Sequence, residues 1–388
     1  MELTVVIVNY NVKYYLAQCL QSVLRATRAI ETELWIVDNA STDGSETYIK
    51  SRFPEVTYVY NTENVGFARA CNQAIRKTSG RYVLLLNPDT IVGEDTLKQA
   101  LRFMNDHPET GAAGVKMMDA CGRFLPESKR GYPTLGATFG KLSGLGRVFP
   151  HQKKLNSYYR NDLSPDGIHP VDVLAGAFML MPRTALEDCG LLDETFFMYG
   201  EDIDLSCRIK EGGYENYYLP YPILHYKGES TDYASYHHVK VFYNAMELFF
   251  QKHDAKRHHW IGRWAVRIGI RGLIGYKCLL VFLKKKLRRK HPEPLQTKFA
   301  ALCPKEHVEK LQQLLHDNNL PEASCYNRQN ASLTLPQGGY THIIIDSTAY
   351  TYAQIIDILP YCHQQKVSLA TYHPQEGILI LPGNVYRK

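Results

Sequence analysis

Residues 81–90 read RYVLLLNPDT, and this stretch decides the fold. Tyr82 to Leu86 form a short, unbroken apolar run, which is typical of a central strand covered by helices on both faces. Pro88 cannot donate a ladder hydrogen bond, so the strand ends before it and Asp89 stands at its carboxyl end. Ligands bind at that edge of open α/β sheets, where a carboxylate can hold a divalent cation against a diphosphate. A turn in which Asp89 caps the next helix is the alternative.

The composition is that of a globular protein long enough for two domains. The chain has 388 residues, of which 45% are hydrophobic. Its nine cysteines are scattered and never spaced as CxxC, which argues against disulfides and zinc sites and favours a reducing cytosol. The amino-terminal LTVVIVN predicts a first strand and shows no signal pattern, so we expect no export.

The net charge of +6 is concentrated in one segment. Residues 256–290 hold twelve Lys and Arg and no acidic residue, whereas the rest of the chain holds 33 basic and 39 acidic residues. Because the basic charge is not spread over the whole surface, we do not expect nucleic acid as a partner.

Strand-like and helix-like stretches alternate between residues 3 and 118, as they do in βαβ units. The pattern predicts strands at 3–8, 34–37, 56–60, 82–86 and 111–117, and helices at 12–24, 46–53, 64–77 and 94–105. The first strand-to-helix connection lacks GxGxxG and no P-loop occurs, which argues against a dinucleotide-binding fold. Because the chain has no glycine-rich loop to bind a diphosphate, a metal ion is the other way to neutralise the charge of such a ligand. Polar residues end three strands at one edge: Asn9, Asp38, and Asn87 with Asp89.

Residues 119–170 have weak periodicity and predict a long excursion over the site, either a lid or a binding loop. Arg130 and Lys129 in this excursion are candidates for phosphate contacts, with a solvated loop charge as the simpler expectation for both. The following VDVLAGAFMLM predicts one strand over residues 171–181. Gly176 interrupts it, either as a bulge or where another molecule approaches the backbone.

An acidic cluster, EDID at residues 201–204, opens a predicted helix. Asp204 and Arg208 are four residues apart on one helix face, so Asp204 has a salt-bridge partner. Asp202 is unpaired in this interpretation, and an unpaired carboxylate near an anion site can remove a proton from a hydroxyl. A plain helix start, in which Glu201 and Asp202 favour the macrodipole, is the alternative. Further along, His225 is a candidate for a metal or diphosphate shell.

The last third has two parts. Residues 256–292 predict a basic amphipathic helical segment with a stripe of Arg263, Arg267 and Arg271. Charge interrupts it too often for a spanning helix, so we expect it to lie on an anionic membrane through residues 256–290, or else to pack on protein. The apolar side chains broadly opposite the stripe are Ile261, Trp264, Ile268, Tyr276, Leu279 and Leu283.

After a plausible linker at residues 292–294, residues 293–388 predict a small α/β unit of unknown role. No active-site motif is found in it. Asp346-Ser347-Thr348 follows a predicted strand and is either a helix cap or an anion site.

Seven motifs in order carry a family resemblance: VVIVNYN, VDNASTDGS, NVGFARACN, LLLNPDT, GAFMLMPR, FFMYGEDIDLSCR and HYKGES. Through them residues 1–255 resemble the family 2 inverting glycosyltransferases of GT-A fold, in particular the rhamnosyltransferase-like subgroup. The resemblance implies an α/β fold with a Rossmann-like mixed sheet and helices on both faces. The QxxRW motif of processive members is absent, which implies transfer of a single sugar.

The resemblance also implies roles for individual residues. Asp202 matches the catalytic base, with Glu201 beside it as a supporting residue. Asp89 matches the retained carboxylate of the family's DXD metal motif, in which Asn87 replaces the first Asp, and His225 matches a histidine near the diphosphate. The implied cofactor is a divalent cation, magnesium or manganese. The implied nucleotide-sugar-binding residues are Asn9, Asp38, Asp43, Asn64, Gly66, Asn72 and Asn87.

The expected function is inverting transfer of one sugar from a nucleotide-sugar donor, dTDP-rhamnose-like or a UDP-sugar. The expected acceptor is a saccharide or lipid-linked saccharide of bacterial cell-surface polysaccharide synthesis, and the expected place is the cytoplasmic face of the cell membrane. The oligomeric state is left open. Alternatives are galactofuranosyl or other hexosyl transfer, a catalytically silent nucleotide-sugar-binding scaffold, and a nucleotidyltransferase that releases pyrophosphate.

Overall fold

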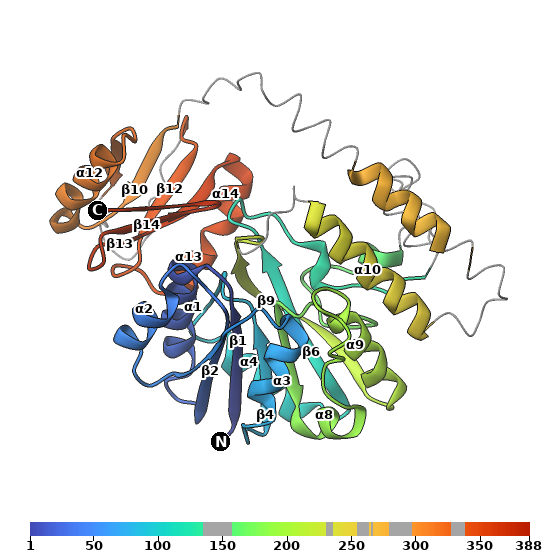
Figure 1. Ribbon diagram of the computed structural model, residues 1–388. Helices are drawn as coiled ribbons and strands as arrows, with labels where there is room; N and C mark the ends of the chain where they lie inside the picture. The colour runs from blue at the N-terminus through green and yellow to red at the C-terminus, as the bar shows by residue number, and fades with distance from the viewer. Residues whose placement is uncertain (135–156, 230–235, 254–263, 265–266, 279–296, 327–337) are drawn as a thin grey trace.

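The structure is a computed structural model that describes residues 1–134, 157–229, 236–253, 264, 267–278, 297–326 and 338–388 (Figure 1). These residues form two sheets with helices against them. The amino-terminal sheet holds the site, and the carboxyl-terminal sheet packs beside its first helix.

The first sheet is mixed and has nine strands in the described residues, in the order β3-β2-β1-β4-β8-β6-β9-β5, with β7 paired to β9. The strands β1 to β4 are mutually parallel, whereas β8 is antiparallel to β4 and β5 is antiparallel to β9. The strands are β1 (Leu3–Asn9), β2 (Thr32–Asn39), β3 (Thr57–Asn61), β4 (Tyr82–Leu86), β5 (Thr90–Val92), β6 (Thr110–Met118), β7 (His169–Val171), β8 (Phe178–Pro182) and β9 (Glu215–His225).

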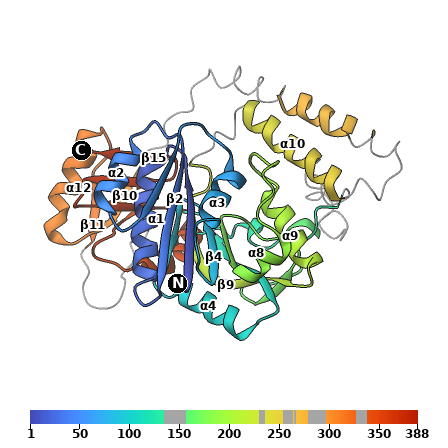
Figure 2. The same cartoon turned by 60° about the horizontal axis from the view of Figure 1, so that its bottom comes forward.

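Helices cover both faces of this sheet (Figure 2). Alternate side chains of β4 serve the two layers: Leu84 packs in the cluster that contains residues of α1, α2 and α4, and Val83 packs with α3, α8 and α9. The helices are α1 (Lys13–Ala26), α2 (Ser45–Arg52), α3 (Phe67–Ile75), α4 (Thr96–Asp106), α8 (Arg183–Cys189), α9 (Glu201–Glu211) and α10 (Tyr236–His253), with the short 3₁₀ turns η1 (Pro126–Ser128) and η2 (Ser157–Tyr159).

The second sheet has the order β11-β10-β12-β13-β14-β15, parallel as far as β13 and antiparallel afterwards. Its elements are β10 (Phe299–Leu302), α12 (Lys305–Asp317), β11 (Ala323–Tyr326), β12 (His342–Asp346), α13 (Tyr352–Asp357), α14 (Leu359–Gln365), β13 (Ser368–His373), β14 (Ile378–Leu381) and β15 (Asn384–Arg387). Asp346 accepts hydrogen bonds from the backbone N–H and the hydroxyl of Thr348, at 2.9 and 2.6 Å. It therefore closes the turn after β12.

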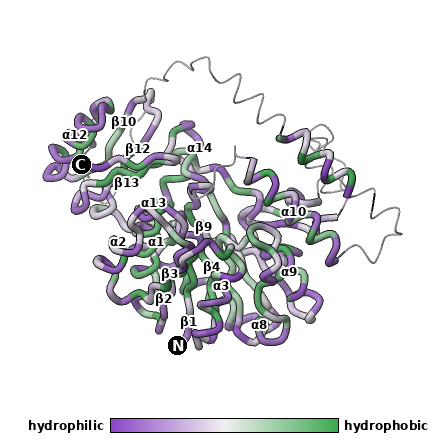
Figure 3. Tube along the Cα trace, in the orientation of Figure 1, coloured by the Kyte–Doolittle hydropathy of each residue, from purple (hydrophilic) through white to green (hydrophobic). Residues whose placement is uncertain are grey.

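One hydrophobic core runs across the seam between the two sheets. Buried Tyr15 and Leu224 of the first unit share a cluster with Ile343 and Tyr352 of the second. The strands on both sides are predominantly apolar (Figure 3). Across the seam the Tyr15 hydroxyl donates to the Leu381 carbonyl at 2.7 Å. The carboxyl-terminal unit is thus packed onto α1 and β9, which lead to the site.

The predicted fold class is confirmed: a mixed sheet has helices on both faces, and a smaller α/β unit follows. Every strand and helix expected over residues 3–118 occurs, with shifted ends. The single strand expected over residues 171–181 is wrong. β7 ends at Val171 and β8 begins at Phe178, because β7 pairs with β9 whereas β8 pairs with β4 and β6. Gly176 lies in the loop between them.

Residues 267–278 are helical and lie along α10 (Figures 1 and 2). Buried Ile270 packs against Val239 and Tyr243 of α10, while Trp264, Ile268 and Tyr276 are exposed. One face thus packs on protein, and another leaves three predicted apolar side chains in solvent. No helix in the described ranges is long and apolar enough to cross a membrane. Arg263, the basic residues 284–290 and the linker at 292–294 lie outside the described residues.

Candidate functional site

Asp89 and His225 are brought together by strand pairing. The backbone leaves β4 after Leu86, passes through Asn87-Pro88-Asp89 and enters β5, where Thr90 is paired with His225 of β9. Asp89 Oδ1 lies 3.3 Å from His225 Nε2. The Asn87 side-chain nitrogen lies 3.4 Å from the same imidazole nitrogen. Three predicted site residues therefore meet at the end of the sheet.

Asp89 is an ionised carboxylate in a buried place. Only 4% of its surface is exposed. Burial by itself raises the pKa of Asp89, but the positive charge of His225 and its hydrogen bond outweigh burial and leave the pKa below the usual value. On the far side of the imidazole ring, Nδ1 of His225 is buried and has no partner among the described residues.

These residues fit a divalent cation that shares its coordination shell with a ligand. No group of three or more His, Cys, Asp or Glu side chains suited to a metal occurs in the described parts of the chain. Magnesium sites on phosphate substrates use only one or two carboxylates, the rest of the shell being phosphate oxygens and water. Asp89 would supply the charged oxygen, and the side chains of Asn87 and His225 lie beside it as further candidate ligands. A phosphate ligand and water would complete such a shell.

Asp202 lies in the first turn of α9, and its carboxylate is ion-paired. Its Oδ2 is 2.6 Å from Nη2 of Arg130. The expectation that Asp202 is unpaired is wrong, because the excursion after β6 brings Arg130 into the site. The expectation of solvated loop charges is also wrong, since Arg130 and Lys129 are buried. The predicted pair of Asp204 with Arg208 occurs, at 2.9 Å.

Glu201 is a buried carboxyl whose pKa is raised. Burial, followed by the negative charge of Asp202, raises the pKa of Glu201 to about 8. Its Oε2 atom is buried without a hydrogen-bond partner in the described residues. The neighbouring carboxyls thus differ: Glu201 has a raised pKa, and Asp202 faces a guanidinium.

One cavity of about 340 Å³ is lined both by Asp89 with His225 and by the acidic pair at the start of α9. Six predicted site residues line it, and they come from both sides of the sheet edge: Asn64, Asn87, Asp89, Glu201, Asp202 and His225. The lining also includes Arg130, a candidate for phosphate contacts, and polar residues that were not predicted as site residues, among them Tyr10, Asn39, Glu127, Tyr158 and Lys227. Lys227 belongs to the HYKGES motif and is ion-paired with Glu127, so its motif was the available signal.

Asn9, Asp38 and Asn72 are predicted nucleotide-sugar residues that lie outside the cavity lining. The Asn9 amide donates to Asp38 at 2.6 Å, and the Tyr58 hydroxyl donates to the same carboxylate at 2.6 Å. The Asn72 amide donates to the Leu192 carbonyl at 2.8 Å. All three side chains are buried and make internal contacts, so in this structure they support the walls of the site.

Gly66 shapes the wall through its backbone. It precedes α3 with a φ of 85°, and a Cβ atom there would lie 2.5 Å from the Phe197 carbonyl oxygen. A side chain would therefore separate α3 from the segment that leads to Glu201. Asn64 accepts a hydrogen bond from the Gly66 N–H at 3.0 Å and faces the cavity itself.

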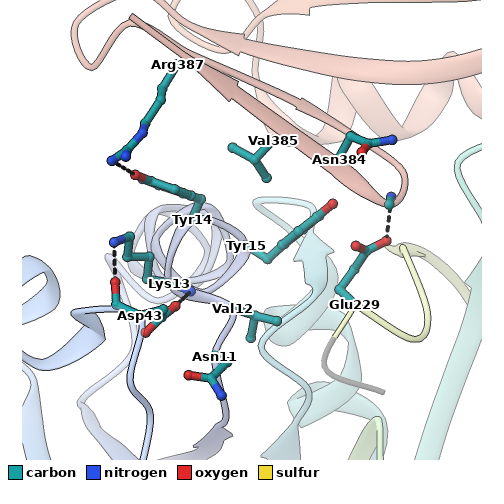
Figure 4. Close-up of a pocket in the computed structure, with 11 residues that line it drawn as sticks. Asn11, Val12, Lys13, Tyr14, Tyr15, Asp43, Glu229, Asn384, Val385 and Arg387 are labelled. Atoms are coloured by element: carbon teal, nitrogen blue, oxygen red, sulfur yellow. Dashed lines mark hydrogen bonds between the residues drawn. The ribbon is translucent and has the colours of Figure 1, made fainter. Parts of the chain in front are cut away.

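Asp43 lies at a second cavity, of about 450 Å³, in the seam between the two sheets (Figure 4). The first turn of α1, Glu229 and the β14–β15 hairpin border it. Glu229 accepts from the Gly383 N–H at 2.9 Å, and Arg387 donates to the Tyr14 hydroxyl at 3.1 Å. Asp43 accepts from the Lys13 N–H at 3.0 Å. The hydrogen bonds of Glu229 and Arg387 join the two units. Asp43 does not line the first cavity, where six other predicted site residues meet.

Comparison with known proteins assigns the first unit to a family. Residues 4–190 match the family described as Glycosyl transferase family 2. The chain is 29% identical over 306 residues to N-acetylglucosaminyl-diphospho-decaprenol L-rhamnosyltransferase of Mycobacterium tuberculosis, a match that covers 76% of this chain and 97% of that protein. It is 28% identical over 133 residues to the poly(ribitol-phosphate) beta-N-acetylglucosaminyltransferase TarS of Staphylococcus aureus, over 33% of this chain and 23% of that protein.

Solved structures give a weaker likeness. A mannosyltransferase from Pyrobaculum calidifontis, in complex with GDP-Man and Mn²⁺, has a TM-score of 0.45 and 17% identity, and the match covers 76% of each chain. That score is too low to decide anything by itself. The sequence matches confirm the resemblance predicted from the ordered motifs. Residues 4–190 thus match the model of Glycosyl transferase family 2, and the relatives that the chain resembles over longer stretches are glycosyltransferases.

Proposed function

We propose that the chain transfers a single sugar, with inversion, from a nucleotide-sugar donor to a saccharide or lipid-linked saccharide acceptor in bacterial cell-surface polysaccharide synthesis. One observation carries the proposal: Asp89 with His225 and the acidic pair at the start of α9 line one cavity, in a chain whose residues 4–190 match Glycosyl transferase family 2. The donor we propose is dTDP-rhamnose-like or a UDP-sugar. The full-length match to a mycobacterial rhamnosyltransferase supports the first of these.

The residues divide the chemistry between two sides of the cavity. Asp202 takes the proton of the acceptor hydroxyl as its oxygen attacks the anomeric carbon, and the nucleoside diphosphate leaves from the opposite face, which inverts the centre. Asp89, Asn87 and His225 would hold magnesium or manganese, which when bound supplies positive charge against the diphosphate. Lys227 adds a cation to the same wall. Burial and the negative charge of Asp202 raise the pKa of Glu201, so we assign the role of base to Asp202 and a supporting role to Glu201.

A membrane surface is the partner that we propose for the helical residues 267–278. Trp264, Ile268 and Tyr276 are 59, 66 and 56% exposed, and Arg271, expected on the stripe opposite them, is exposed as well. Exposed aromatic and basic side chains of a helix suit the interface of an anionic bilayer. Co-sedimentation with vesicles containing anionic lipid, compared with purely zwitterionic vesicles, tests this. Equal binding to both, or to neither, contradicts it.

The function is tested with a panel of nucleotide sugars and Mn²⁺. We expect one donor to raise the Tm and to release its nucleoside diphosphate when a saccharide acceptor is added, with the product of opposite anomeric configuration by NMR. Release of pyrophosphate would identify a nucleotidyltransferase instead. Donor binding without release in the presence of any acceptor would identify a silent scaffold.

The base assignment has its own test. Asp202→Asn keeps the shape of the side chain but cannot accept the proton, so we expect kcat to fall about 10²- to 10⁴-fold. The Tm increase caused by the donor should remain. A variant with near wild-type kcat contradicts the assignment.

A further inference from the structure

Arg130 is a buried cation fixed in place at both ends. Its backbone forms an antiparallel bridge with Val173, in which the Arg130 N–H donates to the Val173 carbonyl at 3.1 Å and the Val173 N–H donates back at 3.0 Å. Its side chain is only 9% exposed, and it crosses the cavity wall to reach Asp202. A buried guanidinium is costly to desolvate, so its position needs several good contacts.

The Asp202 carboxylate accepts hydrogen bonds from the guanidinium of Arg130 and from a backbone N–H. Nη2 of Arg130 donates to Asp202 Oδ2 at 2.6 Å and also to the Leu174 carbonyl. The Gly176 N–H donates to the same Oδ2 atom at 3.2 Å. A Cβ atom at Gly176 would stand 3.5 Å from the Cβ of Asp202, so the loop and α9 are in close contact here. The carboxylate is held between a guanidinium and a backbone amide.

The charges at the start of α9 depend on this one cation. Glu201 and Asp202 are adjacent acids in a poorly solvated place, and Arg130 is the only basic side chain in the described ranges that forms an ion pair with either. The charge of Asp202 raises the pKa of Glu201, and the charge of Arg130 lowers it. Without Arg130, two buried carboxyls would compete for a proton with no countercharge beside them.

We infer that Arg130 is the positioning residue of the proposed base, fixing the direction of the Asp202 carboxylate before the acceptor hydroxyl binds. The inference rests on the proposed function. Arg130 keeps its own proton throughout: the hydroxyl proton passes to Asp202, and the guanidinium stays charged beside the neutral acid. An ammonium group cannot contact a carboxylate and a carbonyl in the same planar geometry, so Arg130→Lys is not a conservative change.

Lys129 provides the matched control. It is buried in the same segment, but its ammonium donates to the Arg160 carbonyl at 2.7 Å and lies over the Phe124 ring, and it does not line the cavity. Burial lowers the pKa of Lys129, so a neutral replacement is tolerable there. Lys129→Met therefore removes a neighbouring buried charge without touching Asp202.

A double-mutant cycle tests the inference with the best donor and acceptor in single-turnover assays. In the wild-type background we expect Arg130→Met to lower the rate about 10²-fold and Arg130→Lys about 10-fold, with the KM for the donor nearly unchanged. In the Asp202→Asn background, both changes should cost less than about 3-fold, because a residue that acts only through Asp202 has nothing left to position. Lys129→Met should stay within about 3-fold of the wild type in both backgrounds.

Two results overturn the inference. One is an unchanged rate in Arg130→Lys and in Arg130→Met; the other is an equal loss in the two backgrounds, which marks a purely structural role. If Arg130→Met does not fold, Arg130→Lys completes the cycle alone. Failure of the proposed function looks different, since the wild type itself would then transfer no sugar.

Discussion

The proton on Glu201 connects stability to pH. An ordinary glutamate ionises near 4.5, whereas the folded chain keeps the Glu201 proton up to about pH 8. The folded-state pKa is raised, so the stabilising contribution is complete below 4.5 and is lost as pH rises through about 8. We expect the wild-type Tm to fall between about pH 5 and about pH 9, and the fall to be smaller in Glu201→Gln, which cannot ionise. Parallel Tm curves for the two proteins would show that Glu201 does not carry a raised pKa.

His225 should set the affinity for the cation. In His225→Ala the imidazole beside Asp89 is gone, and we expect the Mn²⁺ concentration that half-saturates the Tm increase, at fixed nucleoside diphosphate, to rise about 10- to 100-fold. His316→Ala, at an 86% exposed side chain, is the matched histidine control. The same Mn²⁺ dependence in His225→Ala and in this control would remove His225 from the shell.

The sequence predicted those site residues that stand at the ends of regular elements. Asp89 follows a strand, and Glu201 and Asp202 open a helix, so local patterns placed them and the sheet edge brought them together. The contact between Arg130 and Asp202 spans 72 residues and depends on an irregular excursion, for which no periodicity exists. Asp38 is a related case: its pattern is a polar strand end, but its carboxylate accepts hydrogen bonds from the Asn9 and Tyr58 side chains and from the Ser41 N–H.

At the scale of elements, the helix α13 begins on a carboxylate from the other unit. Glu94 accepts from the Tyr352 N–H at 2.9 Å and from the Ala353 N–H at 2.8 Å. Such N–H groups have no partner within the helix, and a carboxylate at this end also suits the helix dipole. We expect Glu94→Ala to cost about 2 kcal/mol of unfolding free energy, measured by urea denaturation. Asp95→Ala, which removes an exposed neighbour without a capping hydrogen bond, should cost clearly less.

Helices and strands could be predicted where the hydrophobic period is clear. They could not be predicted where the pairing of strands decides where a strand begins and ends. The βα alternation of residues 3–118 gave each element in order, because most of these elements bury a regular set of apolar side chains. The VDVLAGAFMLM stretch has the composition of one strand, yet its halves join different partners across the sheet. A sequence pattern reports which side chains are buried and not which neighbouring strand buries them.

At the scale of the whole molecule, the two sheets share a core and should unfold together. Ile91 and Tyr226 of the first unit lie in one buried cluster with Ile355 and Leu369 of the second, and cutting this cluster would expose apolar surface on both sides. Exposure of that surface to water costs about 25 cal/mol per Å², so neither unit gains by opening alone. We therefore expect the carboxyl-terminal unit, although it has its own sheet, to unfold in one step with the first unit.

Coincident unfolding can be measured with one probe in each unit. Trp35 is in β2, and the fully buried Cys362 is in α14. We expect the fluorescence change of Trp35, read in a variant with Trp260 and Trp264 replaced by Phe, to have the same urea midpoint as the labelling of Cys362, followed by peptide mapping. If Cys362 reacts at clearly lower urea than the Trp35 transition, the seam opens first and the two units are independent.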